Sequence, residues 1–151
     1  EFLVGEFSCA TFINADLIAA GLSPFRPEDA AGRAMRLMAE TMHACVEEGR
    51  DFAVESTLSG RTYGKLIPEW RHAGYRVKIV YLKLATVDLA IERVRSRVAQ
   101  GGHAVPEGVI RRRFAQGWEN FANTYRDLAH AWEVFDASGN SPVLLEEGEN
   151  P

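Results

Sequence analysis

The chain has few cysteines and no long hydrophobic run, and each absence excludes a class of protein. Its two cysteines, Cys9 and Cys45, lie too far apart for a metal-binding motif, and we expect free thiols in a reducing cytoplasm. No apolar stretch approaches the roughly 20 residues of a membrane-spanning helix, so we expect no membrane partner. At 46% apolar and 25% charged residues, the composition is typical of a globular domain.

An overall excess of positive charge is also lacking, because the formal net charge is −4. The exception is the stretch 91–113, which carries six arginines and only two glutamates. An arginine cluster on an acidic protein favours a local anionic ligand over nucleic acid, which normally needs a basic domain. The use of arginine favours bidentate phosphate contacts. A solvated helix face is the alternative.

One motif is missing. No segment reads G-x-x-x-x-G-K-[ST], the glycine-rich turn whose backbone N–H groups and lysine hold ATP phosphates. The chain also begins at Glu1 rather than at a methionine. We therefore expect residues 1–151 to be one domain, and a fragment of a longer protein.

Strand and helix patterns alternate along the chain, which predicts an α/β fold with a mostly parallel sheet. Apolar runs bounded by turn residues predict strands at 11–14, 51–55, 75–84, 132–135 and 142–145. Helical periodicity predicts helices at 28–48, 60–72, 86–100 and 106–130.

Several core positions follow from these patterns. The strand at 75–84 is apolar on both faces at its centre, which predicts a buried parallel strand. The helix at 28–48 is predicted to bury one face, made of Ala31, Met35, Met38, Met42 and Cys45. A second predicted core set consists of the aromatic residues Trp70, Trp118, Phe121, Tyr125 and Trp132.

Polar residues follow three of the predicted strands: Asn14 and Asp16, then Glu55, then Asp136. Ligands bind beyond the carboxyl ends of such strands, where a carboxylate can act as general base or hold Mg²⁺ through water. For Asp16 the alternative is an N-cap of the next turn. Glu55 ends an apolar run and is expected to need a donor, a cation or a metal. A structural pair with Arg61 is the alternative there.

The segment 97–115 combines Gly101-Gly102 with arginines and is predicted to be a hinged lid. Glycines permit movement, and a cationic lid suits phosphoryl transfer because that reaction depends on positioning and charge neutralisation. His103 lies in this segment, either facing the ligand or as an ordinary loop residue.

At this point the sequence resembles a known family. The segments TFINADLIAAGLSPF, FAVESTLSGRTY, GYRVKIVYLKL, AIERVRSRVAQGGHAVPEGVIRRRF and WEVFDASG resemble the zeta-toxin-like P-loop kinases, in order over roughly residues 10–140. The resemblance implies a P-loop NTPase/kinase-like fold, a mostly parallel sheet flanked by helices, here without its first strand and P-loop. It also implies ATP with Mg²⁺, the 3′-hydroxyl of UDP-N-acetylglucosamine as acceptor, an antitoxin as candidate partner and a cytoplasmic location.

The resemblance also assigns roles to residues. It implies that Asp16 is the base on the acceptor hydroxyl and that Glu55 is catalytic, in the substrate and Mg²⁺ region. Acceptor binding falls to Asn14, Thr57 and Arg61. The phosphate-binding lid residues are Arg97, His103, Arg112 and Arg113.

The missing phosphate loop departs from the family pattern. Without its lysine and hydroxyl we expect the 151-residue chain alone to be poorly stable and to lack kinase activity. Two alternatives stay open. One is a catalytically dead binding or antitoxin-docking module, and the other is a polynucleotide or other small-molecule kinase.

Overall fold

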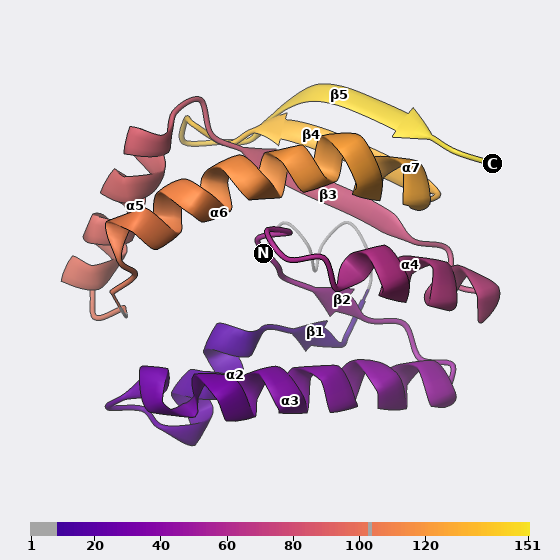
Figure 1. The fold of residues 1–151 in the computed structure, drawn as a ribbon, viewed down its shortest axis with the longest axis horizontal. Coiled ribbons are helices and arrows are strands. Elements are labelled where there is room, and N and C mark those ends of the chain that lie inside the picture. The colour runs from indigo at the N-terminus through magenta and orange to yellow at the C-terminus, as the bar shows by residue number, and fades with distance from the viewer. Residues whose placement is uncertain (1–8, 103) are drawn as a thin grey trace. The chain divides into compact units, whose positions relative to one another are not determined.

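The computed structural model describes residues 9–102 and 104–151, which belong to two compact units. One unit ends at Ser56, and the other runs from Thr57 to Pro151. Each holds one small sheet among helices, so the fold is mixed α/β (Figure 1). We predicted one mostly parallel sheet, whereas the described strands form a parallel pair and a three-stranded mixed sheet. The single domain over residues 1–151 stays a prediction.

The first unit is built on two short parallel strands, β1 (Phe12–Ile13) and β2 (Ala53–Val54). Between them the chain forms α2 (Ala15–Leu22) and α3 (Pro27–Glu47). Proline at the first position of α3, followed by two acidic residues in the first turn, favours the observed start. Gly49, with φ 64°, follows the end of the helix in the left-handed conformation that glycine adopts readily.

The buried face of α3 begins one residue earlier than predicted. Met38, Met42 and Cys45 are buried as expected, but Ala31 and Met35 are exposed. Their places are taken by Ala30 and Ala34, which form a cluster with Ala19 of α2. The two alanines continue the four-residue spacing of Met38 and Met42, so one continuous stripe of α3 is buried, and its N-terminal end packs against α2.

In the second unit β3 (Lys78–Lys83) pairs in parallel with β4 (Ala131–Asp136), and β4 pairs antiparallel with β5 (Val143–Glu149). Helix α4 begins three residues later than predicted and contains Pro68, and β5 extends beyond the predicted strand. A π-helical turn, η1, interrupts the long helix predicted at 106–130. The elements are α4 (Tyr63–His72), β3 (Lys78–Lys83), α5 (Val87–Ala99), α6 (Glu107–Asn120), η1 (Phe121–Tyr125), α7 (Arg126–Leu128), β4 (Ala131–Asp136) and β5 (Val143–Glu149).

Aromatic side chains join the sheet of the second unit to α6 and η1. Of the predicted aromatic core set, Phe121 and Tyr125 are buried, whereas Trp70, Trp118 and Trp132 are half-buried. The Tyr81 ring of β3 stacks on Phe121 with centroids 4.8 Å apart, and Trp118 packs edge-on against Tyr81. The prediction that β3 is buried on both faces is wrong, because Leu82 is 55% exposed. Successive side chains of a strand alternate between faces, so Tyr81 meets the aromatic cluster while Leu82 points the other way.

Cys9 and Cys45 are both free thiols, and Cys45 is buried in α3. Among the described residues no helix is long and apolar enough to cross a membrane.

Candidate functional site

Asn14 and Glu55 meet at the carboxyl ends of the paired strands β1 and β2. The backbone N–H of Glu55 donates to the carbonyl of Ile13 over 3.0 Å, which extends the parallel ladder by one residue. Beyond that point Asn14 Nδ2 donates to Glu55 Oε2 over 2.6 Å. Two polar side chains 41 residues apart in sequence thus face each other where open α/β sheets bind ligands.

Asn14 is also the N-cap of α2. Its Oδ1 accepts hydrogen bonds from the backbone N–H of Asp16 at 2.8 Å and of Leu17 at 3.1 Å. The alternative in which Asp16 caps the helix is therefore wrong. Asp16 lies in the first turn with an exposed side chain that makes no hydrogen bond or ion pair with another described residue.

Glu55 is exposed, which corrects the reasoning that a buried carboxylate requires compensation. Its side chain still has a specific donor, the Asn14 amide, because both residues follow adjacent strands. The alternative partner, Arg61, belongs to the other unit, so an ion pair between Glu55 and Arg61 stays a prediction.

The predicted acceptor residues Thr57 and Arg61 flank a tight loop in the second unit. The Thr57 and Ser59 hydroxyls are hydrogen-bonded at 2.8 Å, and Leu58 has a positive φ of 52°. Arg61 is exposed, and no described residue forms a hydrogen bond or ion pair with its guanidinium. Both residues are therefore accessible, whereas the backbone between them is held from α6 and η1.

The structure separates the six clustered arginines into two groups of three. In the first group, Arg93 donates to the carbonyls of Ala137 and Gly139 and so joins α5 to the turn after β4. Arg95 and Arg111 share Glu107, with ion pairs of 3.6 and 2.7 Å.

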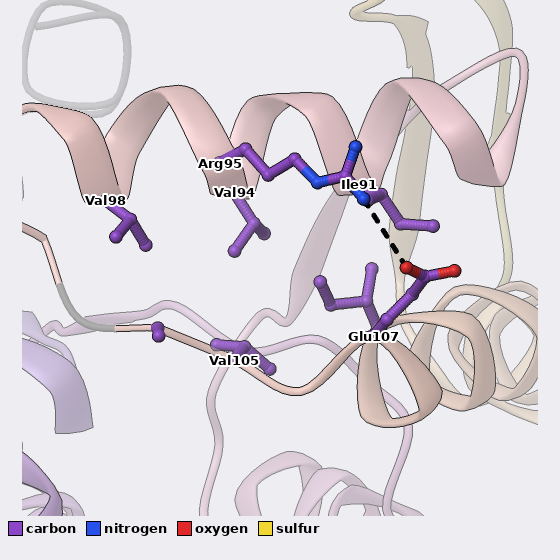
Figure 2. A pocket seen from close by; sticks show the side chains of 8 residues that line it. Ile91, Val94, Arg95, Val98, Val105 and Glu107 are labelled. Carbon is purple, nitrogen blue, oxygen red and sulfur yellow. Dashed lines mark ion pairs between the residues drawn. The ribbon is translucent and has the colours of Figure 1, made fainter.

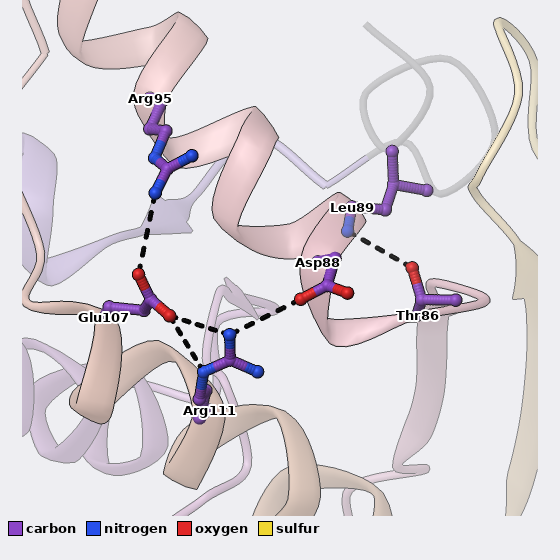
Figure 3. A network of polar contacts seen from close by, with 6 residues as sticks. All are labelled: Thr86, Asp88, Leu89, Arg95, Glu107 and Arg111. Carbon is purple, nitrogen blue, oxygen red and sulfur yellow. Dashed lines mark hydrogen bonds and ion pairs between the residues drawn. The ribbon is translucent and has the colours of Figure 1, made fainter.

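Figure 3 shows how this network continues: Arg111 also reaches Asp88, at 3.4 Å, in the first turn of α5. The hydrogen bonds that Arg111 donates to Glu107 are the main cause that raises the pKa of Arg111, and the charge of Asp88 adds to it. The network therefore connects the start of α6 to α5, and the guanidinium groups of Arg95 and Arg111 are used in these structural contacts.

The second group contains Arg97, Arg112 and Arg113, the three arginines assigned to phosphate binding by resemblance. All three are exposed, and none of their side chains forms a hydrogen bond or ion pair with another residue of the described ranges 9–102 and 104–151. Their guanidinium groups are available to an anion. The fourth predicted lid residue, His103, lies outside the described residues.

An apolar cavity of about 350 Å³ lies between α5 and the segment that leads into α6 (Figure 2). Side chains on both sides of the glycine pair line it, and the Arg95–Glu107 ion pair borders it. The apolar lining consists of Ile91, Val94 and Val98 of α5 and, after the glycine pair, of Ala104, Val105 and Ile110. The cavity therefore lies between α5 and the second half of the predicted lid.

Asp136, which follows the third of the predicted strands with a polar end, stabilises the turn after β4. Its carboxylate accepts the backbone N–H of Ser138 at 2.8 Å, and hydrogen bonds from Ser138 hold the pKa of Asp136 below its ordinary value. In the described part of the chain, no three His, Cys, Asp or Glu side chains are grouped so as to hold a metal ion.

Comparison with known proteins agrees with the resemblance found from the motifs. An uncharacterized protein of Haemophilus influenzae is 28% identical over 102 residues, which cover 68% of this chain and 73% of that protein. No solved structure matches. The model of the zeta toxin family matches residues 28–148, a range that includes Glu55, Thr57 and Arg61 but not Asn14 or Asp16. Because this match covers most of the sequence, the chain belongs to the zeta toxin family, a family of kinases.

Proposed function

We propose that the protein carries the acceptor side of an ATP-dependent kinase that phosphorylates the 3′-hydroxyl of UDP-N-acetylglucosamine. The observation that carries the proposal is the 2.6 Å hydrogen bond from Asn14 to Glu55 at the ends of two parallel strands. The Asp16 carboxylate, which no other described residue engages, lies in the turn that Asn14 caps. Membership of the zeta toxin family supports the choice of reaction.

In this proposal Asp16 is the general base. An ionised carboxylate must lie within hydrogen-bond reach of the hydroxyl whose proton it takes. The sugar hydroxyl loses its proton to Asp16 as its oxygen attacks the γ-phosphorus, and the bond from phosphorus to the ADP oxygen breaks. Asp16 suits this role because its side chain is exposed and is not used by another described residue.

Glu55 and Asn14 would orient the acceptor. The carboxylate of Glu55 has a second oxygen beyond the one that Asn14 engages, and this oxygen can accept a hydrogen bond from a sugar hydroxyl. Thr57 and Arg61 supply a hydroxyl and a cation for the nucleotide or sugar. Arg97, Arg112 and Arg113 would neutralise the phosphates, since phosphoryl transfer is catalysed mainly by positioning and charge stabilisation.

The residues present do not supply every part of such an enzyme. The printed sequence has no G-x-x-x-x-G-K-[ST] segment, so it offers neither the lysine nor the hydroxyl that P-loop kinases use for ATP phosphates and Mg²⁺. We assign no step to a protein-bound Mg²⁺, and propose that the 151 residues alone bind the acceptor without turning over ATP.

The first test is to read the coding sequence upstream of the codon for Glu1. A strand followed by G-x-x-x-x-G-K-[ST] within about 40 residues, the length of one strand–loop–helix element, supports the kinase. The longer product should then convert UDP-N-acetylglucosamine and ATP to a phosphorylated sugar nucleotide, detected by ³¹P NMR. An upstream start codon without such a loop would favour a binding or antitoxin-docking module.

A matched pair of variants tests the role of Asp16. Asp16→Asn removes the proposed base, whereas Asp29→Asn makes the same change in the first turn of α3. In the longer product that contains the phosphate loop, we expect turnover to fall about 10²- to 10⁴-fold for the first variant only, as for loss of a general base. Equal rates in the two variants would exclude Asp16 as the base.

Phosphorylation of an RNA oligonucleotide in place of the sugar nucleotide would indicate a polynucleotide kinase.

A further inference from the structure

The loop Thr57–Gly60, called the 57–60 loop below, holds an unfavourable backbone conformation. Leu58 has φ 52°, in the left-handed region that residues with a Cβ rarely occupy. Glycine, asparagine and aspartate are the usual residues there, and leucine is not. Such conformations persist where the surrounding structure holds them, and they cluster at functional sites. The contacts that hold this loop therefore identify residues with a role.

Two side chains, one from α6 and one from η1, hold the 57–60 loop through hydrogen bonds to its carbonyl oxygens. Asn120 Nδ2 donates to the carbonyl of Leu58 at 2.9 Å and to that of Gly60 at 3.3 Å. The Tyr125 hydroxyl donates to the same Gly60 carbonyl. Both carbonyl groups on either side of Ser59 are thereby fixed from one side.

The π-helical turn makes this joint contact possible. In an α-helix of 3.6 residues per turn, residues five apart lie about 140° apart around the axis. In η1 the backbone N–H of Arg126 instead reaches the carbonyl of Phe121, five residues earlier. A π-turn therefore brings positions five apart onto the same side, and Asn120 and Tyr125 are five apart.

The approach of the loop to α6 requires a glycine. A Cβ on Gly117 would lie 2.5 Å from the carbonyl oxygen of Thr57, closer than real contacts allow. Tyr125 in turn is only 1% exposed, and its ring meets Tyr63 edge-on at 6.4 Å. Burial raises the pKa of Tyr125, so its hydroxyl remains a proton donor at neutral pH.

From this geometry we infer that Asn120 and Tyr125 are positioning residues for acceptor binding. They hold the 57–60 loop so that Thr57 at one end and Arg61 just beyond the other are presented to the acceptor. The inference rests on the proposed function, because Thr57 and Arg61 bind the acceptor there. It goes beyond that function by assigning a role to a helix remote in sequence.

Two measurements on the 151-residue chain test this role. Amide hydrogen exchange at residues 59–61 reports whether the loop is held, and calorimetric titration with UDP-N-acetylglucosamine reports whether holding matters for the acceptor. We expect Asn120→Ala and Tyr125→Phe each to speed loop exchange and to weaken acceptor binding about tenfold, as for a lost hydrogen bond to a half-buried group. Tyr125→Phe keeps the ring and its packing, so it remains informative if Asn120→Ala fails to fold.

Asn150→Ala is the matched control. Asn150 is also half-buried and also donates from Nδ2 to two backbone carbonyls, those of Arg126 at 2.6 Å and Ala129 at 2.8 Å, but not to the loop. We expect it to lower the melting temperature while loop exchange and acceptor affinity stay within twofold of wild type. If Asn120→Ala and Asn150→Ala have the same effects on exchange and affinity, the inference is wrong.

A second-site change separates positioning from general stability. Glycine adopts φ 52° without the conformational free-energy cost that the Cβ of leucine causes. Adding Leu58→Gly to Asn120→Ala should therefore recover part of the acceptor affinity that Asn120→Ala loses. A purely structural role for Asn120 predicts no recovery. If the wild-type chain does not bind UDP-N-acetylglucosamine at all, the proposed function fails, while the exchange comparison still decides whether Asn120 and Tyr125 hold the loop.

Discussion

Asn14 links two candidate catalytic carboxylates through one side chain: its Nδ2 donates to Glu55 at 2.6 Å, and its Oδ1 accepts from the backbone N–H of Asp16 at 2.8 Å. The amide thus fixes the Glu55 side chain directly and fixes Asp16 through the helix start that it caps. Because an amide has a donor end and an acceptor end, asparagine can make both contacts at once, whereas an ionised aspartate has no proton to donate to Glu55.

The two functions of Asn14 can be separated by substitution. Asn14→Asp keeps an oxygen for the N-cap, and aspartate caps as well as asparagine, so the melting temperature should change little. The same change places a second carboxylate against Glu55, and we expect affinity for UDP-N-acetylglucosamine to fall at least tenfold. Asn14→Ala should lose the cap as well, costing about 1 kcal/mol of unfolding free energy. Unchanged affinity in Asn14→Asp would show that the contact with Glu55 does not serve the acceptor.

The second prediction concerns Arg97, Arg112 and Arg113, the group of arginines whose side chains have no partner among the described residues. Arg112→Gln removes a cation with no partner among the described residues, so it should weaken binding of tripolyphosphate about tenfold with no loss of thermal stability. Arg33→Gln is the control, because Arg33 is an exposed arginine of α3, and it should leave binding unchanged. Titration calorimetry at low and moderate salt measures both. Equal weakening by the two variants would mean that the anion binds by net charge alone.

Much of the element order was predictable because it depends on local signals. The apolar runs, the Thr86 cap of α5 and the proline at the start of α3 act within a few residues, and the structure confirms them. The polar residues after the apolar runs also predicted that Asn14 and Glu55 lie at strand ends. That the two side chains meet was not predicted, because it depends on β1 and β2 being neighbours in the sheet.

Other features depend on partners distant in sequence and could not be predicted. Periodicity alone does not decide between Ala30 and Ala31, because α2 determines which side of α3 is covered. The segment Phe121–Tyr125 fits an α-helix by composition, yet it forms a π-turn that lets Tyr125 reach the carbonyl of Gly60. Leucine gives no local signal for the positive φ of Leu58, which depends on contacts from Asn120.

The environment of His130 leads to a prediction of how the unfolding free energy depends on pH. Its Nδ1 accepts the backbone N–H of Val77 at 3.0 Å, so the neutral ring is required. Burial, and then the charges of Arg71 and Arg76, lower the pKa of His130 below its ordinary value of 6.5. Because the unfolded chain takes up the proton more readily, the unfolding free energy should fall as the pH drops below about 6.5. Urea unfolding at pH 7.5 and 5.5 measures the change.

The control for His130 is His130→Asn, whose side-chain oxygen can accept the same hydrogen bond without titrating. In this variant the part of the pH dependence that belongs to His130 should disappear, so the difference between pH 7.5 and 5.5 should become smaller. If the variant and the wild-type chain lose the same unfolding free energy, protonation of another group causes the effect.

Two glycines of the same helix give the last prediction. An alanine normally stabilises a helix by about 0.5–1 kcal/mol relative to glycine. Gly108 has open space around an added Cβ, so Gly108→Ala should be neutral or stabilising. At Gly117 the added Cβ would meet the Thr57 carbonyl oxygen at 2.5 Å and the Tyr81 hydroxyl at 3.4 Å. Since the nearer atom is backbone, the 57–60 loop must move away, and Gly117→Ala should destabilise the chain despite the helix preference.

Urea unfolding and acceptor titration together decide how the loop responds to Gly117→Ala. If the loop must lie against α6 to bind the acceptor, this variant weakens UDP-N-acetylglucosamine binding, while Gly108→Ala binds like wild type. If a destabilised Gly117→Ala chain binds the acceptor normally, the position of Thr57 does not determine the acceptor affinity. Binding would then depend on the Arg61 side chain rather than on the backbone of the loop. Equal stability of the two variants would contradict the close approach of the loop to α6.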